Sequence, residues 1–415
     1  MNRVEKFVYD IVKKNPKLKL KIRNIYQSAF DLLPDKKDEF SGNLTEKKGF
    51  FFGFHDISPW SQNEEFILSN KLEIDLHMPE KGEPLTVGFW NREMSVFTPI
   101  KQTLAWNYHK GCRLQWIGNS NEQFIFNDVV GEKVGAVISS IDGNIIKSIQ
   151  DPIDTVSPDG RYATSFSYER LNRYMPGYGY VYKDNPFFEE AASEHTGLFL
   201  IDLISGNKKL IVSLSSLANI KTEKSMHNAH HYVTHTEFSP DGDRISFLHR
   251  WTHEDPNQRF TRLVTCKLDG SDIYISNTSG MVSHYDWDRN HGILAYSQVN
   301  GIDGHYIFKD YKMDNGIRVG KELNSDGHQS YIPGTNKFIT DTYPDKRRRS
   351  KLFLVDIETD NVIKIADMKS PKKYQSPNVY KHWACDLHPR VSPSGRFVSF
   401  DTVHSGERAF CIMSL

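Results

Sequence analysis

Short alternating apolar segments recur along the chain after residue 45, and each follows a turn rich in proline, glycine or asparagine. The clearest turns are Ser-Pro-Asp-Gly at 157–160 and 239–242, and Ser-Pro-Ser-Gly at 392–395. Proline suits a turn position with its fixed φ, and glycine follows where a positive φ is allowed. An alternating strand such as Arg244–Leu248 comes next. The pattern predicts repeated β-hairpins.

Four weaker copies of the same unit bring the number of units to seven. Each unit is followed by a second apolar run, and several of these runs close on a tight Asp-Gly or Ser-Gly turn. Four strands in each of seven units are typical of a β-propeller, in which neighbouring sheets bury each other's faces. We therefore predict an all-β fold, a seven-bladed β-propeller over residues 46–415. The weaker turns lie at 58–61, 118–121, 288–291 and 333–336, and the clearest second runs at 197–202, 262–267 and 351–356.

The seventh unit reaches the end of the chain before a fourth strand can form. We expect the segment near Phe50 to Phe54 to complete that blade and so close the ring. The longest gap between units, from Ser157 to Ser239, contains the Tyr/Gly/Pro-rich stretch 172–180. We interpret this stretch as a loop on one face, where insertions commonly serve binding.

Residues 1–45 do not share the repeat and are predicted to form a short N-terminal helical extension, basic and amphipathic. Val4, Phe7, Val8 and Ile11 fall at helical spacing, with lysines between the apolar positions that follow. Such a helix could make a peripheral contact with an anionic membrane through residues 1–40. It could equally pack on the propeller with a solvated basic face. Both interpretations stay open.

Charge and composition narrow the classes of function. Lys+Arg 52 against Asp+Glu 52 leaves no net charge, which argues against a nucleic-acid partner. No apolar run reaches the length of a membrane span, and the N-terminus does not have the pattern of a secretory signal. The four cysteines are scattered and are expected to be reduced. We expect a cytoplasmic protein, with a peripheral location at the inner membrane as the alternative.

Histidine recurs at one register of the repeat. When the units are aligned, the position four or five residues before the turn is histidine in four units and Arg113 in a fifth, and His55 lies one place away in the first unit. Equivalent positions of a propeller lie at equivalent heights around its axis, so these side chains should converge. Histidine is only 17 of 415 residues, which makes a chance recurrence improbable. The four histidines are His235, His284, His328 and His388.

Clustered imidazoles suit a divalent metal, and imidazole also serves as a general base near neutral pH. Asp386 and Gln329 would add the oxygen ligands that Mn tolerates. Besides Arg113 and His55, two further side chains are candidates for substrate contact: His231, from the histidine-rich start of the fourth unit, and Tyr285. The basic run 346–351 is either a solvated hairpin tip or an anion-binding rim.

The order of motifs from about residue 195 to 415 resembles the oligogalacturonate lyase family of seven-bladed propellers, which are related in shape to TolB-type propellers. The likeness is carried by Arg262-Leu with Leu268-Asp-Gly-Ser-Asp272, by Ser283-His284-Tyr-Asp-Trp287, by Gly327-His328 and by Asp386-Leu-His388-Pro389. The first half of the chain shows the repeat without these motifs.

The resemblance implies that His284 is the catalytic base and that Arg262 binds the substrate carboxylate or assists the base. It implies that His328 and His388 are metal ligands. Where the family has a further histidine this chain has Asp386, and the family's glutamine ligand falls near Trp383. His382 or Gln329 would then replace that glutamine.

The leading hypothesis is a lyase that depends on a divalent metal, Mn most of all, and cleaves a uronate-containing oligosaccharide or polysaccharide by β-elimination. His284, Arg262 and His235 would be its catalytic residues. The alternative is a protein of capsule or lipopolysaccharide biosynthesis, such as a glycosyl transferase, held at the inner membrane by its N-terminal helix. A third interpretation is an interaction scaffold with a vestigial metal site, because propellers host all three functions.

Overall fold

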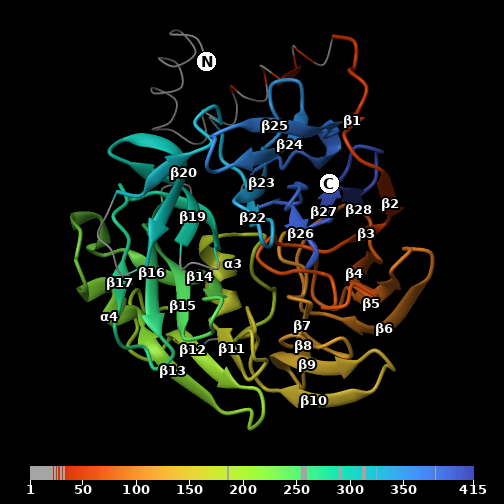
Figure 1. Ribbon diagram of the computed structural model, residues 1–415. Coiled ribbons are helices and arrows are strands. Elements are labelled where there is room, and N and C mark those ends of the chain that lie inside the picture. The colour runs from red at the N-terminus through yellow and green to blue at the C-terminus, as the bar shows by residue number, and fades with distance from the viewer. Residues whose placement is uncertain are drawn as a thin grey trace.

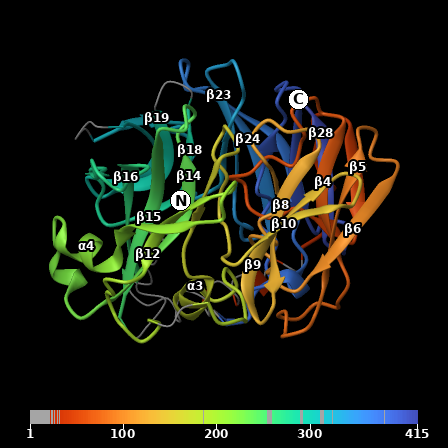
Figure 2. The ribbon, with the colours of Figure 1, turned by 90° about the horizontal axis from the view of Figure 1, so that it is seen from below.

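The strands form seven sheets around a central axis, as the two views of the computed structural model show (Figures 1 and 2). The prediction of a seven-bladed β-propeller is confirmed. The structure describes residues 33–184, 187–253, 259–288, 292–310, 315–323, 325–378 and 380–415, together with residues 22, 25, 27, 28 and 30.

Blades 1 to 3 are antiparallel sheets built from consecutive strands. The bridges Trp60–Ile67 and Val156–Ala163 extend the innermost backbone of blades 1 and 3. Blade 1 contains β3 (Phe50–Phe51), β4 (Phe66–Leu72), β5 (Leu85–Asn91) and β6 (Phe97–Thr103). Blade 2 contains β7 (Gln115–Trp116), β8 (Gln123–Val130), β9 (Lys133–Ser140) and β10 (Ile145–Ile149). Blade 3 contains β11 (Tyr162–Ser165), β12 (Gly197–Asp202) and β13 (Lys208–Ser213).

Blades 4 and 5 each have four antiparallel strands in chain order, and their first strands β14 and β18 lie next to each other at the axis. Blade 4 contains β14 (His230–Phe238), β15 (Arg244–Thr252), β16 (Arg259–Lys267) and β17 (Tyr274–Ile275). Blade 5 contains β18 (Val282–Trp287), β19 (Gly292–Val299), β20 (Ile302–Lys309) and β21 (Ile317–Val319).

Blades 6 and 7 are completed by strands from the N-terminal part of the chain. Blade 6 contains β22 (Gln329–Tyr331), β23 (Lys337–Asp341), β24 (Arg349–Asp356), β25 (Val362–Lys369) and β1 (Glu39–Phe40). Blade 7 contains β26 (Arg390–Val391), β27 (Phe397–Thr402), β28 (Ala409–Ser414) and β2 (Leu44–Lys48). The sheets of the propeller thus begin before residue 46.

The ring is closed by an N-terminal strand, as expected, but the expected strand was the wrong one. Thr45 pairs with Ile412 and Lys48 with Ala409, so β2 is the outer strand of blade 7. Phe50–Phe51 instead pairs with β4 as the start of blade 1. Gly49, at φ 78°, makes the turn between these two strands. The segment was misassigned because its apolar residues suit either blade equally.

The recurring turn has the same chemistry in each clear copy. The serine Oγ accepts a hydrogen bond from the backbone N–H five residues later, at 2.9 Å for Ser157 and 3.0 Å for Ser239. The glycine lies in the left-handed region, at φ 74° for Gly160 and 73° for Gly242. A side chain at the glycine would be strained in this conformation, so the turn motif reflects a real backbone requirement.

The insertion between β11 and β12 is partly helical, whereas the sequence led us to expect a loop throughout 172–180. Helix α3 (Tyr168–Tyr174) begins at Ser167, whose hydroxyl accepts from Arg170 N. Tyr178 and Tyr180, which follow the helix, are buried in the same apolar cluster as Leu171. The insertion therefore packs into the propeller. The other short helices are α4 (Leu214–Asn219), η1 (Lys224–Met226) and η2 (Lys372–Tyr374).

The N-terminal extension is described only in part. Residues 22, 25, 27, 28 and 30 are helical, while most of the predicted basic amphipathic segment lies outside the described residues. Within the described part of the chain, no helix is both long enough and apolar enough to cross a membrane. Membrane contact through residues 1–40 stays a prediction.

Candidate active site

Imidazoles from five inner segments of the propeller converge at the axis. The ring centroids of His284 and His328 are 3.9 Å apart, those of His328 and His388 4.3 Å, and those of His235 and His284 6.0 Å. His55 joins them, 5.1 Å from His328. The prediction that these five side chains meet is confirmed.

Phe54 occupies the middle of this cluster. Its ring centroid lies 4.6 to 5.8 Å from the centroids of all five imidazoles, and only 2% of the residue is exposed. The ammonium group of Lys110 lies 5.7 Å from the same ring. Phe54 therefore fills the space between the imidazoles with apolar atoms.

At several positions of the repeated register, an irregular backbone conformation directs the side chain toward the axis. Arg113, His235 and His388 adopt φ values of 56°, 53° and 47°, in the left-handed region that disfavours residues other than glycine. The pairing of β14 with β15 shifts register between Thr234 and Glu237. An irregularity of this kind redirects a side chain, and the left-handed conformation costs about 1–2 kcal/mol per residue. Strain at the same register in three blades is typical of functional sites.

Hydrogen bonds at Nδ1 orient most of the imidazoles. His55 Nδ1 donates to the Gln329 carbonyl at 2.9 Å, and His328 Nδ1 lies 3.0 Å from both oxygens of Asp341. His284 Nδ1 lies 3.2 Å from Ser283 Oγ, which itself donates to Asp326 at 2.6 Å. The serine can then only accept from His284, so Nδ1 carries the proton and Nε2 has a lone pair.

Three of the opposite nitrogens are buried without a hydrogen bond to any described residue. Among the described residues, Nε2 of His235, His328 and His388 has no hydrogen-bond partner. A buried polar atom without a partner is unfavourable unless a ligand or ion satisfies it. Three such atoms around one axis are chemically suited to a cation or to proton transfer.

Burial sets the protonation states of these imidazoles. It lowers the pKa of His55, His235, His284 and His388 well below the ordinary 6.5, and nearby positive groups lower it further. For His328 burial also lowers the pKa, but the Asp341 carboxylate outweighs it and the net pKa is raised. The other four are neutral near pH 7 and can bind a metal or accept a proton.

A compact group of possible metal ligands adjoins the cluster. His109, Asp386 and His388 each offer a ligand atom within 4.8 Å of the others. His109 Nδ1 lies 3.6 Å from Asp386 Oδ2, and within the described structure neither atom makes a hydrogen bond. Two imidazoles and a carboxylate fit a divalent metal such as Mn or Zn.

Two of the four metal ligands proposed from the sequence, His388 and Asp386, belong to this group. His328 lies beside His388, and its Nδ1 is held by a carboxylate as in many metal-binding histidines. Gln329 is buried with its Oε1 lacking a hydrogen-bond partner in the described structure, while its Nε2 donates to the Gly327 carbonyl. His109 was missed.

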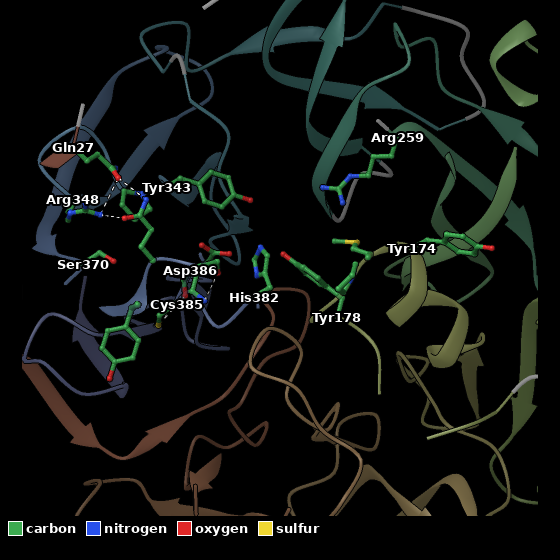
Figure 3. A pocket seen from close by; sticks show the side chains of 17 residues that line it. Gln27, Tyr174, Tyr178, Arg259, Tyr343, Arg348, Ser370, His382, Cys385 and Asp386 are labelled. Atoms are coloured by element: carbon green, nitrogen blue, oxygen red, sulfur yellow. Dashed lines mark hydrogen bonds between the residues drawn. The ribbon is translucent and has the colours of Figure 1, made fainter. Parts of the chain in front are cut away.

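A cleft of about 390 Å³ opens beside these ligands. Figure 3 shows Tyr178, Tyr343 and His382 around its middle, with Asp386 beside them and Arg259 farther out. Tyr178 stacks on His109 with ring centroids 4.5 Å apart, and Tyr343 lies 5.9 Å from His328. His284 does not line the cleft.

Arg250 lies beside the cluster, whereas Arg262 lies elsewhere. Arg262 is on β16, where it donates to His249 Nδ1 at 3.0 Å and to the Leu217 carbonyl at the end of α4 at 2.7 Å. Arg250 donates to the Ser283 carbonyl at 3.3 Å, and its Nε has no hydrogen-bond partner within the described structure. Burial lowers the pKa of Arg250 to about 10, so it remains charged.

Three residues expected to contact substrate are engaged in the interior instead. Arg113 forms a bidentate pair with Asp56 at 2.8 and 2.9 Å and also contacts Asp154. Tyr285 donates its hydroxyl to the His235 carbonyl and is 1% exposed. His231 lies 2.9 Å from His249 Nε2, in the ladder that leads to Arg262. The repeat register correctly predicted that Arg113 lies at the axis. The sequence does not show that the buried carboxylates of Asp56 and Asp154 hold its guanidinium.

The fold and the site together define a seven-bladed β-propeller protein with an axial histidine cluster. Two solved oligogalacturonate lyases share this fold. One, described in complex with manganese, aligns with a TM-score of 0.64 at 10% identity over 92% of this chain and 96% of its own. The other, from Vibrio parahaemolyticus, has a TM-score of 0.58 at 13% identity over 92% of this chain and 98% of its own.

The resemblance to oligogalacturonate lyases is thus confirmed as one of fold. A GH74 enzyme of Niastella koreensis aligns less well, with a TM-score of 0.49 at 9% identity over 89% of this chain and 53% of its own. Neither a protein-family profile nor a curated protein matches the sequence.

Proposed function

We propose that the protein is a metal-dependent lyase that cleaves a uronate-containing glycan by β-elimination. The observation that carries the proposal is the buried group His109, Asp386 and His388 beside a cleft that also presents arginines. The shared fold with oligogalacturonate lyases supports it, and the manganese in the description of one of them favours Mn in the proposal.

The chemistry requires a positive charge near the sugar carboxylate, because the hydrogen α to a carboxylate is only weakly acidic. A divalent metal held by His109, Asp386 and His388, with His328 beside them, would neutralise that carboxylate and stabilise the carbanion-like transition state. Arg250 adds a fixed charge, since its guanidinium lies against the Ser283 carbonyl next to His284.

His284 is the proposed base. Its Nδ1–H faces Ser283 Oγ and lies 3.4 Å from Asp326 Oδ1, which leaves the Nε2 lone pair to accept a proton. The low pKa imposed by burial keeps the ring neutral before reaction. Asp326 would stabilise the imidazolium that forms.

Tyr178 and Tyr343 are the proposed sources of the proton for the departing glycosidic oxygen. Both line the cleft, and burial raises the pKa of both phenols, so each holds its proton at neutral pH. Tyr285, the sequence candidate for substrate contact, cannot supply this proton, because its hydroxyl already donates to the His235 carbonyl. Because His284 does not line the cleft, the proposal requires the reacting sugar to enter between these two tyrosines.

The experiment is an absorbance assay for the unsaturated product with uronate oligomers and added Mn²⁺. His284→Ala should lower kcat by about 10²–10⁴-fold, the range for loss of a general base. His231→Ala, a buried histidine outside the cluster, should change stability but not kcat. Full product formation by His284→Ala would refute the mechanism. A purified protein without stoichiometric metal would favour the scaffold hypothesis.

A further inference from the structure

A second cleft, of about 350 Å³, opens at the other end of the propeller axis. The inner strand β14 (His230–Phe238) connects the two ends. Tyr174, which lines the cleft beside Asp386, stacks on His230, whereas Phe238 lines the second cleft. The nine residues of this strand span roughly 25 Å, so the two clefts are separate. No step of the proposed lyase reaction uses the second cleft.

The ionisable side chains that line the second cleft are all acidic. They are Asp56, Glu237 and Asp286, and no lysine, arginine or histidine is among the described residues of its lining. Asp56 is neutralised by Arg113, which it contacts at 2.8 and 2.9 Å. Asp286 accepts a hydrogen bond from Tyr331 N at 2.7 Å and has no cationic partner in the described structure. The cleft therefore presents carboxyl groups whose charge nothing in the described chain balances.

Glu237 is the residue that points to a ligand. It is 8% exposed, and its carboxyl makes no hydrogen bond or ion pair with any described residue. A buried polar group of this kind is unfavourable unless a ligand satisfies it. Burial raises the pKa of Glu237 well above its usual value, and the carboxyls of Asp286 and Asp56 raise it further, whereas Arg113 lowers it. A positive charge among these carboxyls would offset both unfavourable effects.

The geometry of the second cleft favours an organic cation over a metal ion. The three acids are too far apart to ligate one ion, because among the described residues only the group at the other end of the axis has three candidate ligand atoms within 4.8 Å of one another. Trp60, Trp116 and Trp287 line the second cleft together with the acids. Aromatic rings attract ammonium groups and also pack against methylene groups.

A neighbouring hollow of about 500 Å³ provides room for a longer ligand. It shares Asp56 and Asp286 with the second cleft. Its arginine, Arg390, is paired with Asp401 at 2.8 Å and so adds no net positive charge. A ligand with two ammonium groups could therefore occupy both spaces.

We propose that this end of the axis binds a small aliphatic diamine or polyamine, with one ammonium group between Glu237 and Asp286 and its methylene groups against the tryptophans. The site is independent of the lyase proposal, because it uses none of the proposed metal, base or proton-donor residues.

The test is calorimetric titration of the full chain with the diamine putrescine, at low ionic strength and about pH 8, where Asp286 with its pKa of about 7 is ionised. Butanediol is the uncharged ligand of the same length, and Mg²⁺ is the metal probe. Glu237→Gln and Asp286→Asn each remove one carboxylate with little change of shape. Asp367→Asn is the matched control, because it removes a buried carboxylate that pairs with Arg349 and does not line the second cleft.

One putrescine should bind per chain, and butanediol should not bind. Glu237→Gln and Asp286→Asn should each raise the Kd for putrescine by about 10-fold or more, as expected for loss of one hydrogen bond to a charged group. Asp367→Asn should keep the wild-type Kd. Without ligand, Glu237→Gln should keep or raise the Tm, since the wild-type carboxyl has no partner to lose, whereas loss of a purely structural acid would lower it.

The site would be refuted by a wild type that does not bind putrescine or that binds butanediol equally well. An unchanged Kd in both cleft variants, or the same loss in Asp367→Asn, would place any bound amine elsewhere and overturn the assignment. Mg²⁺ binding that disappears in Glu237→Gln would show a metal site instead. The lyase proposal is tested separately by product formation, so it can stand or fall without these results.

Discussion

Asp341 joins two of the blades that carry the central imidazoles, and its replacement by asparagine tests the site most directly. One carboxylate oxygen accepts from His328 N at 2.7 Å, the other from His388 N at 3.0 Å, and both lie 3.0 Å from His328 Nδ1. Asparagine keeps one acceptor. Its amide NH₂ would face at least one of these N–H donors, so that hydrogen bond is lost.

The loss can be estimated from these contacts. A hydrogen bond to a charged group contributes about 1.5–3 kcal/mol, so Asp341→Asn should lower the free energy of unfolding by at least that amount. Carboxylates that hold metal-binding histidines typically account for about 10–100-fold in metal affinity. We therefore expect the Kd for Mn²⁺, measured by calorimetry, to rise by about that factor.

Asp367→Asn provides the control. Asp367 is equally buried, but it holds Arg349 on the outer part of blade 6 and touches no imidazole of the cluster. Its loss should lower the free energy of unfolding and leave the Mn²⁺ affinity unchanged. Wild-type Mn²⁺ affinity in Asp341→Asn, or an equal loss in both variants, would refute the assignment of metal binding to these blades.

Three further predictions address protonation, buried charge and the arginines. Because burial lowers the pKa of His55, His235, His284 and His388 below the ordinary 6.5, the unfolded chain binds more protons once the pH falls below that value. Stability measured by urea unfolding should therefore decrease from pH 7 to pH 5, by up to about 1.4 kcal/mol per pH unit for each histidine, and a flat profile would contradict their burial. Asp154→Asn should lower the free energy of unfolding by about 3–5 kcal/mol, because Lys110 and Arg113 would lose a buried counter-charge; a loss below about 1 kcal/mol would be inconsistent with that. Arg250→Gln should reduce kcat/KM for uronate oligomers about 10–100-fold, whereas Arg262→Gln should lower Tm with little change in kcat/KM, and the reverse result would restore the family-based assignment.

The blades and the axial histidines were predictable because both depend on a local, repeated pattern. The serine and glycine of each clear turn make the same contacts in blades 3 and 4, so the turn marks each blade in the sequence. Counting back from it locates the residue that faces the axis. That is why His235, His284, His328 and His388 could be grouped without coordinates.

The residues that were missed lie outside that register. His109 comes from the connection that precedes blade 2, four residues before Arg113, and only the folded chain brings it to Asp386. Arg250 and Arg262 lie on adjacent strands of one blade, and the sequence does not show which of them points toward His284. The seventh blade needed a choice between two nearby apolar segments, which depends on long-range pairing.

The pairing of β2 with β28 also orders events during synthesis. The candidate metal and base residues are spread from His55 to His388, and the blades that hold them form a closed ring only when Ala409–Ser414 reaches Leu44–Lys48. A nascent chain still lacking β28 has an open ring on the ribosome. The histidines can adopt their final arrangement only after β28 has been translated, so the assembled site is itself a sign that the ring has closed.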